Sequence, residues 1–240
     1  MIGLGTLFNV AGILIGGFLG IFCKKLITER IQETLLKANG VCVLFLGIAG
    51  TLEQMFTVEG GRLSGGGTMM LILSLSLGVL VGEWIDLDTK MERFGRWLKE
   101  KTGNARDSMF VDGFVTASLT VCIGAMAIVG AIQDGLTGDY ATLLTKAILD
   151  CIIICVMTAS MGKGCMFSAI PVALLQGFVT LLATQIAPLM TEAALGNLSL
   201  VGNVLIFCVG VNLVWDNTRI RVANMLPAIV VAVAWAFLPV

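Results

Sequence analysis

Residues 127–155 combine apolar Ala, Ile and Leu with four charged side chains: Asp134, Asp139, Lys146 and Asp150. An ionised side chain in the middle of a membrane costs at least about 2.5–3.5 kcal/mol on insertion scales. Charges in such surroundings need an opposite charge, polar neighbours or water. The stretch therefore marks the first place to look for ion or solute chemistry.

Asp150 is the charge that is hardest to explain by position alone. It lies about 12 Å into its predicted helix at 1.5 Å per residue, too deep for a short carboxylate to reach the membrane surface. Lys146 is four residues earlier, so the two side chains share a helix face and can pair. Two interpretations stay open. One is a structural ion pair, and the other is a polar cavity where Asp150 binds a cation or proton, or Lys146 an anion.

The other two acids in this stretch have simpler explanations. Asp134 ends a predicted span beside Gly135, which fits a turn at the outer surface but also a place in the cavity. Asp139 precedes the next span and is expected to cap its free amide groups. Lys146 can also extend its ammonium outward along its helix.

Amide side chains within apolar segments are further candidates, because a buried amide needs partners. Asn9 and Gln176 are the ones we place in the candidate site, with Asn203 and Asn212 as weaker candidates. Gln176 follows Pro171, whose missing N–H predicts a kink or break in that helix. A broken helix turns backbone groups toward a ligand, as in many transporters.

The whole chain has the composition of a membrane protein. It has 240 residues, 57% hydrophobic and 13% charged, with a net charge of −1 and a mean hydropathy of +0.96. A soluble chain carries about 25% charge. We therefore predict an all-α polytopic bundle whose solvent is the lipid bilayer, and no nucleic-acid partner.

Several kinds of chemistry are excluded by residue types that are missing. The sequence has no histidine, which removes imidazole catalysis and His-ligated metal sites. The seven cysteines lie in or beside apolar runs without a C-x-x-C pair and are read as small hydrophobic residues. The sequence "GLTGDY" matches neither Tyr-Asp nor Gly-x-Gly-Asp of intramembrane aspartyl proteases. We expect no enzyme, no metal and no cofactor.

Apolar segments long enough to span a membrane give the topology. Eight are predicted, or seven if one is re-entrant, and the second and third are short: 2–23, 38–53, 68–83, 113–133, 142–161, 165–188, 199–215 and 224–240. Loops rich in Lys and Arg alternate with loops that have almost none, which places both termini outside. The first segment lacks a preceding basic residue and is expected to be retained rather than cleaved.

Two connecting segments differ from ordinary loops. Residues 84–101 place Leu87, Met91, Phe94 and Leu98 at helical spacing with charges between them, which predicts a cytoplasmic amphipathic helix. It either lies on the membrane surface or packs on the bundle. Residues 59–67, rich in glycine, are expected to form a flexible outer loop.

Internal similarity suggests that the single membrane domain, 1–240, contains three units of about 80 residues. "VCVLFLGIAGTLEQ" and "VCIGAMAIVGAIQD" are offset by 80. The predicted repeats are 1–80, 81–162 and 163–240, with the third inverted. Glycines at four-residue spacing (Gly12, Gly16 and Gly20; Gly78 and Gly82) predict close helix contacts, within the chain or in a homo-oligomer.

The chain resembles a bacterial family. "GTLFNVAGILIGGFLG", "GEWIDLDTKMERFGRWLK", "CIGAMAIVGAIQDGLTGD" and "FSAIPVALLQG" are similar to the YdfK/YqgA-like membrane proteins, the family of domain of unknown function 554. The resemblance covers essentially the whole chain and implies an integral protein of the bacterial inner membrane. It carries no activity or site residues to this sequence.

Two functions follow as hypotheses. The first is a transporter or channel for a small solute or ion, working by alternating access around Asp150, Lys146, Asp134, Asn9 and Gln176. The alternative is a scaffold or regulator without transport, acting through the amphipathic helix 84–101.

Overall fold

The computed structural model describes residues 2–26, 28–59, 62–105, 107–215 and 219–238. Arg106, part of the predicted basic segment 84–112, and Asp216, expected at the membrane interface, lie outside the described residues. The chain forms two compact units built from interleaved segments: unit 1 is Met1–Asn39, Thr89–Cys122 and Met126–Ile186, and unit 2 is Gly40–Asp88, Ile123–Ala125 and Ala187–Val240. These boundaries do not follow the proposed 80-residue repeats, which stay a prediction, as does the single domain.

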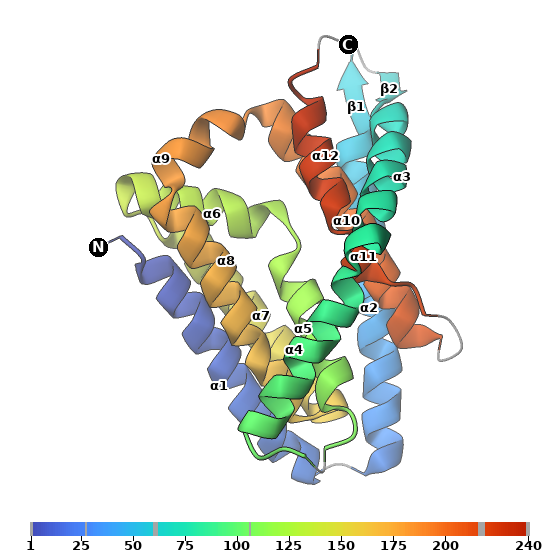
Figure 1. Cartoon of the computed structure of the whole chain (residues 1–240), viewed down its shortest axis with the longest axis vertical. Coiled ribbons are helices and arrows are strands. Elements are labelled where there is room, and N and C mark those ends of the chain that lie inside the picture. Colours follow the sequence, from blue (N-terminus) through green and yellow to red (C-terminus); the bar gives the residue numbers. More distant parts are fainter. Residues whose placement is uncertain (1, 27, 60–61, 106, 216–218, 239–240) are drawn as a thin grey trace. The chain divides into compact units, whose positions relative to one another are not determined.

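Unit 1 contains α1, the start of α2 and most of the middle of the chain (Figure 1). Its elements are α1 (Leu4–Leu26), the first turns of α2 (Glu29–Met55), nearly all of α4 (Leu87–Lys101), α5 (Phe110–Cys122), α6 (Ala125–Thr137), α7 (Ala141–Met161), the 3-10 helix η1 (Lys163–Ser168), α8 (Ala169–Leu181) and α9 (Ala183–Ile186).

Unit 2 contains the rest of α2 and the C-terminal helices. Its other elements are β1 (Phe56–Glu59), β2 (Arg62–Gly65), α3 (Thr68–Ile85), the 3-10 helix η2 (Ala187–Leu189), α10 (Glu192–Val214), α11 (Val222–Met225) and α12 (Pro227–Trp235). The strands form an antiparallel hairpin with Phe56 opposite Gly65. The outer segment predicted as a flexible loop is thus partly a hairpin, because the alternating residues 56–59 pair with those after the glycines.

The predicted polytopic helical architecture is confirmed. Within the described residues, six helices are long and apolar enough to cross a membrane, and a bent pair, α5 with α6, raises the number to seven. The second span is longer than the predicted 38–53, because the helix begins at Glu29 and α2 has 27 residues. The eighth predicted segment is a shorter apolar helix, Val222–Trp235, so in the described part of the chain six helices, or seven spans with the bent pair, satisfy the length criterion.

The first glycine series lets α1 and α7 approach closely. A Cβ at Gly12, Gly16 or Gly20 would meet the backbone carbonyl of Ala147, Cys151 or Cys155, respectively. Both sets rise together along the sequence, so α1 and α7 run in the same direction. Close backbone approach replaces the hydrophobic force that is absent between helices in lipid. The predicted contact ridge is confirmed as a contact within the chain.

The second glycine series also allows close contact between helices, here within unit 2. Gly78 and Gly82 of α3 face the backbone of Ala228 and Asn224, so α3 runs antiparallel to α11 and α12. The apolar core beside them contains Met70, Leu200, Val201, Ala228 and Ala232. Thr191 starts α10 by accepting a hydrogen bond from the Ala194 N–H at 3.2 Å.

The break in a spanning helix occurs at Gly124 instead of after Pro171. Helices α5 and α6 meet at an angle of 63°, visible in Figure 1, and Gly124 between them has φ +142°, where a side chain is strained. Pro171 lies in the first turn of α8, where its missing N–H has no helical partner to lose. The prediction of a kink after Pro171 is therefore wrong.

The predicted amphipathic helix is α4, and it packs on the bundle of unit 1. Leu98 lies in a buried cluster with Phe110 and Phe114 of α5. Phe94 and Trp97 stack at 5.7 Å between ring centroids, and they are 37% and 50% exposed. Helix α4 thus makes the contact with the bundle that the packed alternative describes, and two aromatic side chains are left partly uncovered.

Candidate intramembrane polar site

Lys146 and Asp150 form a buried ion pair on α7. The Lys146 Nζ lies 2.9 Å from Oδ1 and 2.8 Å from Oδ2 of Asp150. The two residues are only 8% and 3% exposed, so Lys146 does not extend outward to the membrane surface. Their i, i+4 spacing on one helix face makes this contact possible without help from another helix. Neutralising each other reduces the cost of holding two charges away from water.

The pair lies next to groups from two other elements of unit 1. The amide of Asn9 on α1 adjoins the Asp150 carboxylate, although neither of its atoms meets hydrogen-bond geometry. The thiol of Cys122 is near enough to Lys146 and Asp150 to interact electrostatically with both charges. Cys122 is the last residue of α5, so the ion pair lies close to where the bent span is broken.

Asp134 is buried and caps the first helix, contrary to the expected surface turn. It lies inside α6 and is 0% exposed. Its Oδ1 accepts a hydrogen bond from the Gly3 N–H at 3.2 Å, and its Oδ2 accepts one from the Gly5 N–H at 3.1 Å. Free amides and the helix dipole at the start of α1 both favour a carboxylate there. This role was missed because its partners are 129 and 131 residues away.

Asp139 behaves more nearly as predicted. Its Oδ1 accepts a hydrogen bond from the Ala141 N–H, the first residue of α7, at 3.0 Å. Close by, the hydroxyl of Thr142 donates a hydrogen bond to Oε1 of Gln133 at 2.7 Å. This bond joins the end of α6 to the start of α7.

Gln176 belongs to a group of buried polar side chains without protein partners. It is 1% exposed, and neither amide atom has a hydrogen-bond partner among the residues described. Four hydroxyl groups of unit 1 share this condition: Thr6, Thr158, Ser168 and Thr180. A buried polar atom without a partner costs about 1–3 kcal/mol, so this many in one unit requires an explanation.

The sequence candidates therefore divide between the units. Asp134, Lys146, Asp150, Asn9 and Gln176 all belong to unit 1. Asn203 and Asn212 belong to unit 2, where the Asn203 side chain lies against Gly50 and Asn212 donates to the Ile220 carbonyl at 2.7 Å. The contacts of Asn203 and Asn212 are therefore with residues of unit 2 and not with the ion pair.

A recess of about 350 Å³ opens at the end of α1 and α7 in unit 1. It is lined by Ile21, Lys24, Asp107, Gly162 and Lys163. Gly162 has φ +98° and would bring a Cβ against Asp107 and Lys24. No group of three or more His, Cys, Asp or Glu side chains in the described residues has the geometry of a metal site.

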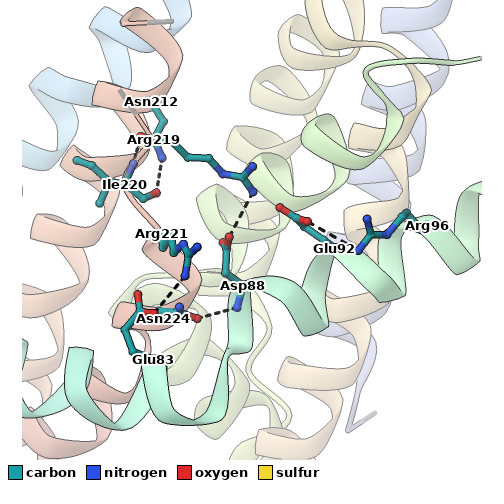
Figure 2. A network of polar contacts seen from close by, with 9 residues as sticks. All are labelled: Glu83, Asp88, Glu92, Arg96, Asn212, Arg219, Ile220, Arg221 and Asn224. Atoms are coloured by element: carbon teal, nitrogen blue, oxygen red, sulfur yellow. Dashed lines mark hydrogen bonds and ion pairs between the residues drawn. The ribbon is translucent and has the colours of Figure 1, made fainter. Parts of the chain in front are cut away.

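A second polar network ties unit 2 together (Figure 2). Arg219 pairs with Asp88 at 3.3 Å, and Arg221 pairs with Glu83 at 3.2 Å. The Asp88 N–H donates to Oδ1 of Asn224 at 2.7 Å. These contacts join the end of α3 and the start of α4 to the segment before α11. In the sequence, Arg219 and Arg221 indicate only a basic loop between the last two predicted spans.

Taken together, the spanning helices, glycine contacts and buried charges define a polytopic α-helical membrane protein. The family model described as "Protein of unknown function (DUF554)" matches residues 4–237. The chain belongs to this family, as the resemblance implied.

Two relatives match along nearly their whole length. One is "Uncharacterized membrane protein YdfK" of Bacillus subtilis (strain 168), 27% identical over 227 residues, which cover 95% of this chain and 93% of the relative. The other is "Uncharacterized protein YqgA" of Escherichia coli (strain K12), 26% identical over 233 residues, covering 95% and 94%. No solved structure matches the chain.

Proposed function

We propose that this protein is a transporter or channel for a small solute or ion in the bacterial inner membrane. The observation that carries the proposal is the buried Lys146–Asp150 pair beside a broken membrane span. A charged pair is expensive to keep within a bilayer, and irregular backbone is tolerated there only inside protein or along a water-filled path. Transporters combine these two features around their substrates.

The proposed site consists of Asp150, Lys146 and Asn9, with the α5 end at Cys122 beside it. Asp150 binds a cation or proton when its contact with Lys146 loosens, and the Lys146 ammonium balances the charge. Asp134 ties α6 to the start of α1. A change in the angle between α5 and α6 at Gly124 then alters access to the pair from one side, which is an alternating-access mechanism.

The proposed topology counts α12 as an eighth crossing, although it is shorter than the other spans, and follows the distribution of Lys and Arg, which then places both termini outside. It is supported by helix directions within each unit: α1 and α7 are parallel, whereas α3 and α12 are antiparallel. Odd-numbered spans should share a direction, as spans one and five do here. We propose no catalytic reaction.

The test is flux into proteoliposomes that contain the purified protein, driven by imposed gradients of H⁺, Na⁺, K⁺ or Cl⁻. The variants are Asp150→Asn and the exchanged pair Lys146→Asp/Asp150→Lys. The pair Glu92 and Arg96 on α4, also spaced i, i+4 at 3.9 Å but with Glu92 half-buried and Arg96 exposed, supplies the control through the same exchange. Folding is checked by size-exclusion profile and thermal unfolding.

We expect both α7 variants to remain folded and to lose at least tenfold in flux, while the α4 exchange leaves flux unchanged. An exchanged α7 pair that folds and transports normally would mean that the two charges only hold the helix structure. That result would overturn the proposed site.

A second function is supported by α4. Phe94 and Trp97 remain 37% and 50% exposed after the helix has packed through Leu98. A scaffold or regulator would use these rings on a partner or at the membrane surface. Its signature is that Trp97→Ala removes the cellular phenotype of the protein while Asp150→Asn does not, the reverse of what transport requires.

A further inference from the structure

Six uncharged, deeply buried residues among those described in unit 1 have polar side-chain atoms without protein partners, and these residues follow one another along the helices. They come from four elements: Thr6 and Asn9 of α1, Thr158 of α7, Ser168 of η1, and Gln176 and Thr180 of α8. All are at least nine-tenths buried. The contacts of the other helices with α1 show which part of α1 each of these residues lies beside. Below, a level means a position along the length of α1.

The first level is the start of α1. Asp134 binds the Gly5 N–H there, and a Cβ on the next α6 residue, Gly135, would meet the Thr180 carbonyl. Thr180 of α8 therefore lies near the beginning of α1, where Thr6 is the next residue after Gly5. Two buried hydroxyl groups thus lie at the level of the buried Asp134 carboxylate.

The middle level is that of the ion pair. Asn9 is one turn after Gly5 on α1 and adjoins Asp150. Helix α8 runs opposite to α1, because its preceding turn at Met166 contacts Gly17 while Thr180 lies near the start of α1. Gln176, one turn back from Thr180, therefore falls between the first level and the ion pair.

The last level leads to the recess at the end of α1. Ser168 follows the Met166 contact with Gly17, and the Thr158 side chain would meet a Cβ on Gly20. One turn further, Gly162 adjoins Asp107 and Lys24, two residues that line the recess. The polar groups therefore extend from Asp134 at one end of unit 1 to the open recess at the other.

Dry burial of these groups is physically costly, because each unpaired amide or hydroxyl loses its hydrogen bonds to water. Internal water molecules solve this problem when each finds two to four polar partners. Inside a bilayer, polar groups must be satisfied by protein or by such water. Amides and hydroxyls both donate and accept, so they order water into a hydrogen-bonded file.

We propose that these groups hold a file of water molecules along which protons pass through unit 1, with Asp150 as the site that binds and releases them. This inference rests on the proposed function and names its ion. Asp150 pairs with Lys146 on its own helix and adjoins the amide of Asn9 on α1. Proton transfer needs only a carboxylate that can take up and release the proton and hydrogen-bonded water beside it.

The first experiment tests for the water itself. Brief X-ray irradiation of the protein in detergent or nanodiscs splits water into hydroxyl radicals, which oxidise methionines beside internal water. Met157 is 0% exposed and lies next to Thr158 on α7, whereas Met70 is 3% exposed within the apolar core of unit 2. We expect Met157 to be oxidised at least five times faster than Met70.

The second experiment measures proton uptake into proteoliposomes with an enclosed pH-sensitive dye. Gln176→Leu and Thr158→Val should each reduce uptake at least tenfold. The matched controls are Gln185→Leu on α9, the same change at an exposed position, and Thr145→Val, an exposed threonine on α7. Both controls should retain normal uptake.

The outcomes separate this inference from the proposed function. Met157 protected as strongly as Met70 overturns the water file, whatever the flux results are. Oxidised Met157 with transport of another ion but no proton uptake overturns the proton as the ion and leaves the transporter proposal standing. Oxidised Met157 together with uptake that depends on Gln176 and Thr158 supports the inference.

Discussion

The Oδ2 of Asp134 on α6 accepts a hydrogen bond of 3.1 Å from the backbone N–H of Gly5 on α1. This contact links the second half of the bent span to the start of the first span. A carboxylate that is 0% exposed and bound to two amides at a helix N-terminus is held by charge-assisted hydrogen bonds. The same residue therefore stabilises the bundle and positions α6.

Replacing Asp134 by Asn should destabilise unit 1. The amide keeps one acceptor oxygen and loses the charge, so we expect a loss of about 2 kcal/mol in unfolding free energy. Thermal unfolding in detergent measures the change. Asp139→Asn is the control, since Asp139 is exposed and accepts the Ala141 N–H. Equal effects at both positions would argue against a special role for the buried carboxylate.

Removing one charge of the Lys146–Asp150 pair should harm stability more than removing both. Lys146→Met alone leaves a buried carboxylate unpaired and is expected to cost about 3–5 kcal/mol, or to force Asp150 to take up a proton. The double variant Lys146→Met/Asp150→Leu should recover most of that stability while transport stays absent. Arg96→Met on α4 removes the exposed partner of a weak pair at 3.9 Å and should cost less than about 1 kcal/mol.

The glycine contact between α1 and α7 predicts a sharp size limit. A Cβ at Gly16 would meet the Cys151 carbonyl, so Gly16→Ala must push the two helices apart at a cost of about 1–3 kcal/mol. Gly177 on α8 has open space around its Cβ position. Gly177→Ala should be neutral or slightly stabilising, since alanine favours helix over glycine. Similar melting temperatures for both variants would contradict the close contact.

Features of the fold and of the candidate site were predictable from the sequence where the interacting residues are close together in the chain. Apolar length gave the class of protein, and i, i+4 spacing gave the Lys146–Asp150 pair, because both are local. The role of Asp134 depends on glycines at the far end of the chain, and nothing near Asp134 in sequence indicates it. Likewise, Pro171 looked like the helix breaker because proline is an obvious local signal. Gly124 breaks its helix instead, since only the folded path gives it φ +142°.

Gly124→Ala should strain the break between α5 and α6. A residue with a side chain at φ +142° lies outside the favoured regions and costs about 1–3 kcal/mol. We expect lower thermal stability and, if the bend changes during transport, altered flux as well. Gly177→Ala again provides the comparison. An unaffected melting temperature would show that the backbone at this position can relax.

The network of Figure 2 predicts different costs for its buried and exposed contacts. Asn224→Leu leaves the Asp88 N–H without its 2.7 Å acceptor and should cost about 1–3 kcal/mol. Arg221→Gln removes an exposed pair with Glu83 and should cost less than about 1 kcal/mol. Hydrogen exchange at the Asp88 amide should accelerate in the first variant and not in the second.

The parallel contact between α1 and α7 also constrains how the protein is made. The glycine face of α1 enters the membrane long before its partner carbonyls on α7 have been synthesised. During that interval lipid or a membrane chaperone must cover Gly12, Gly16 and Gly20, and segments of the other unit are inserted in between. A ribosome stalled before residue 141 should therefore leave the glycine face of α1 accessible to crosslinking by lipid-soluble probes, and release of the full chain should end the accessibility of that face.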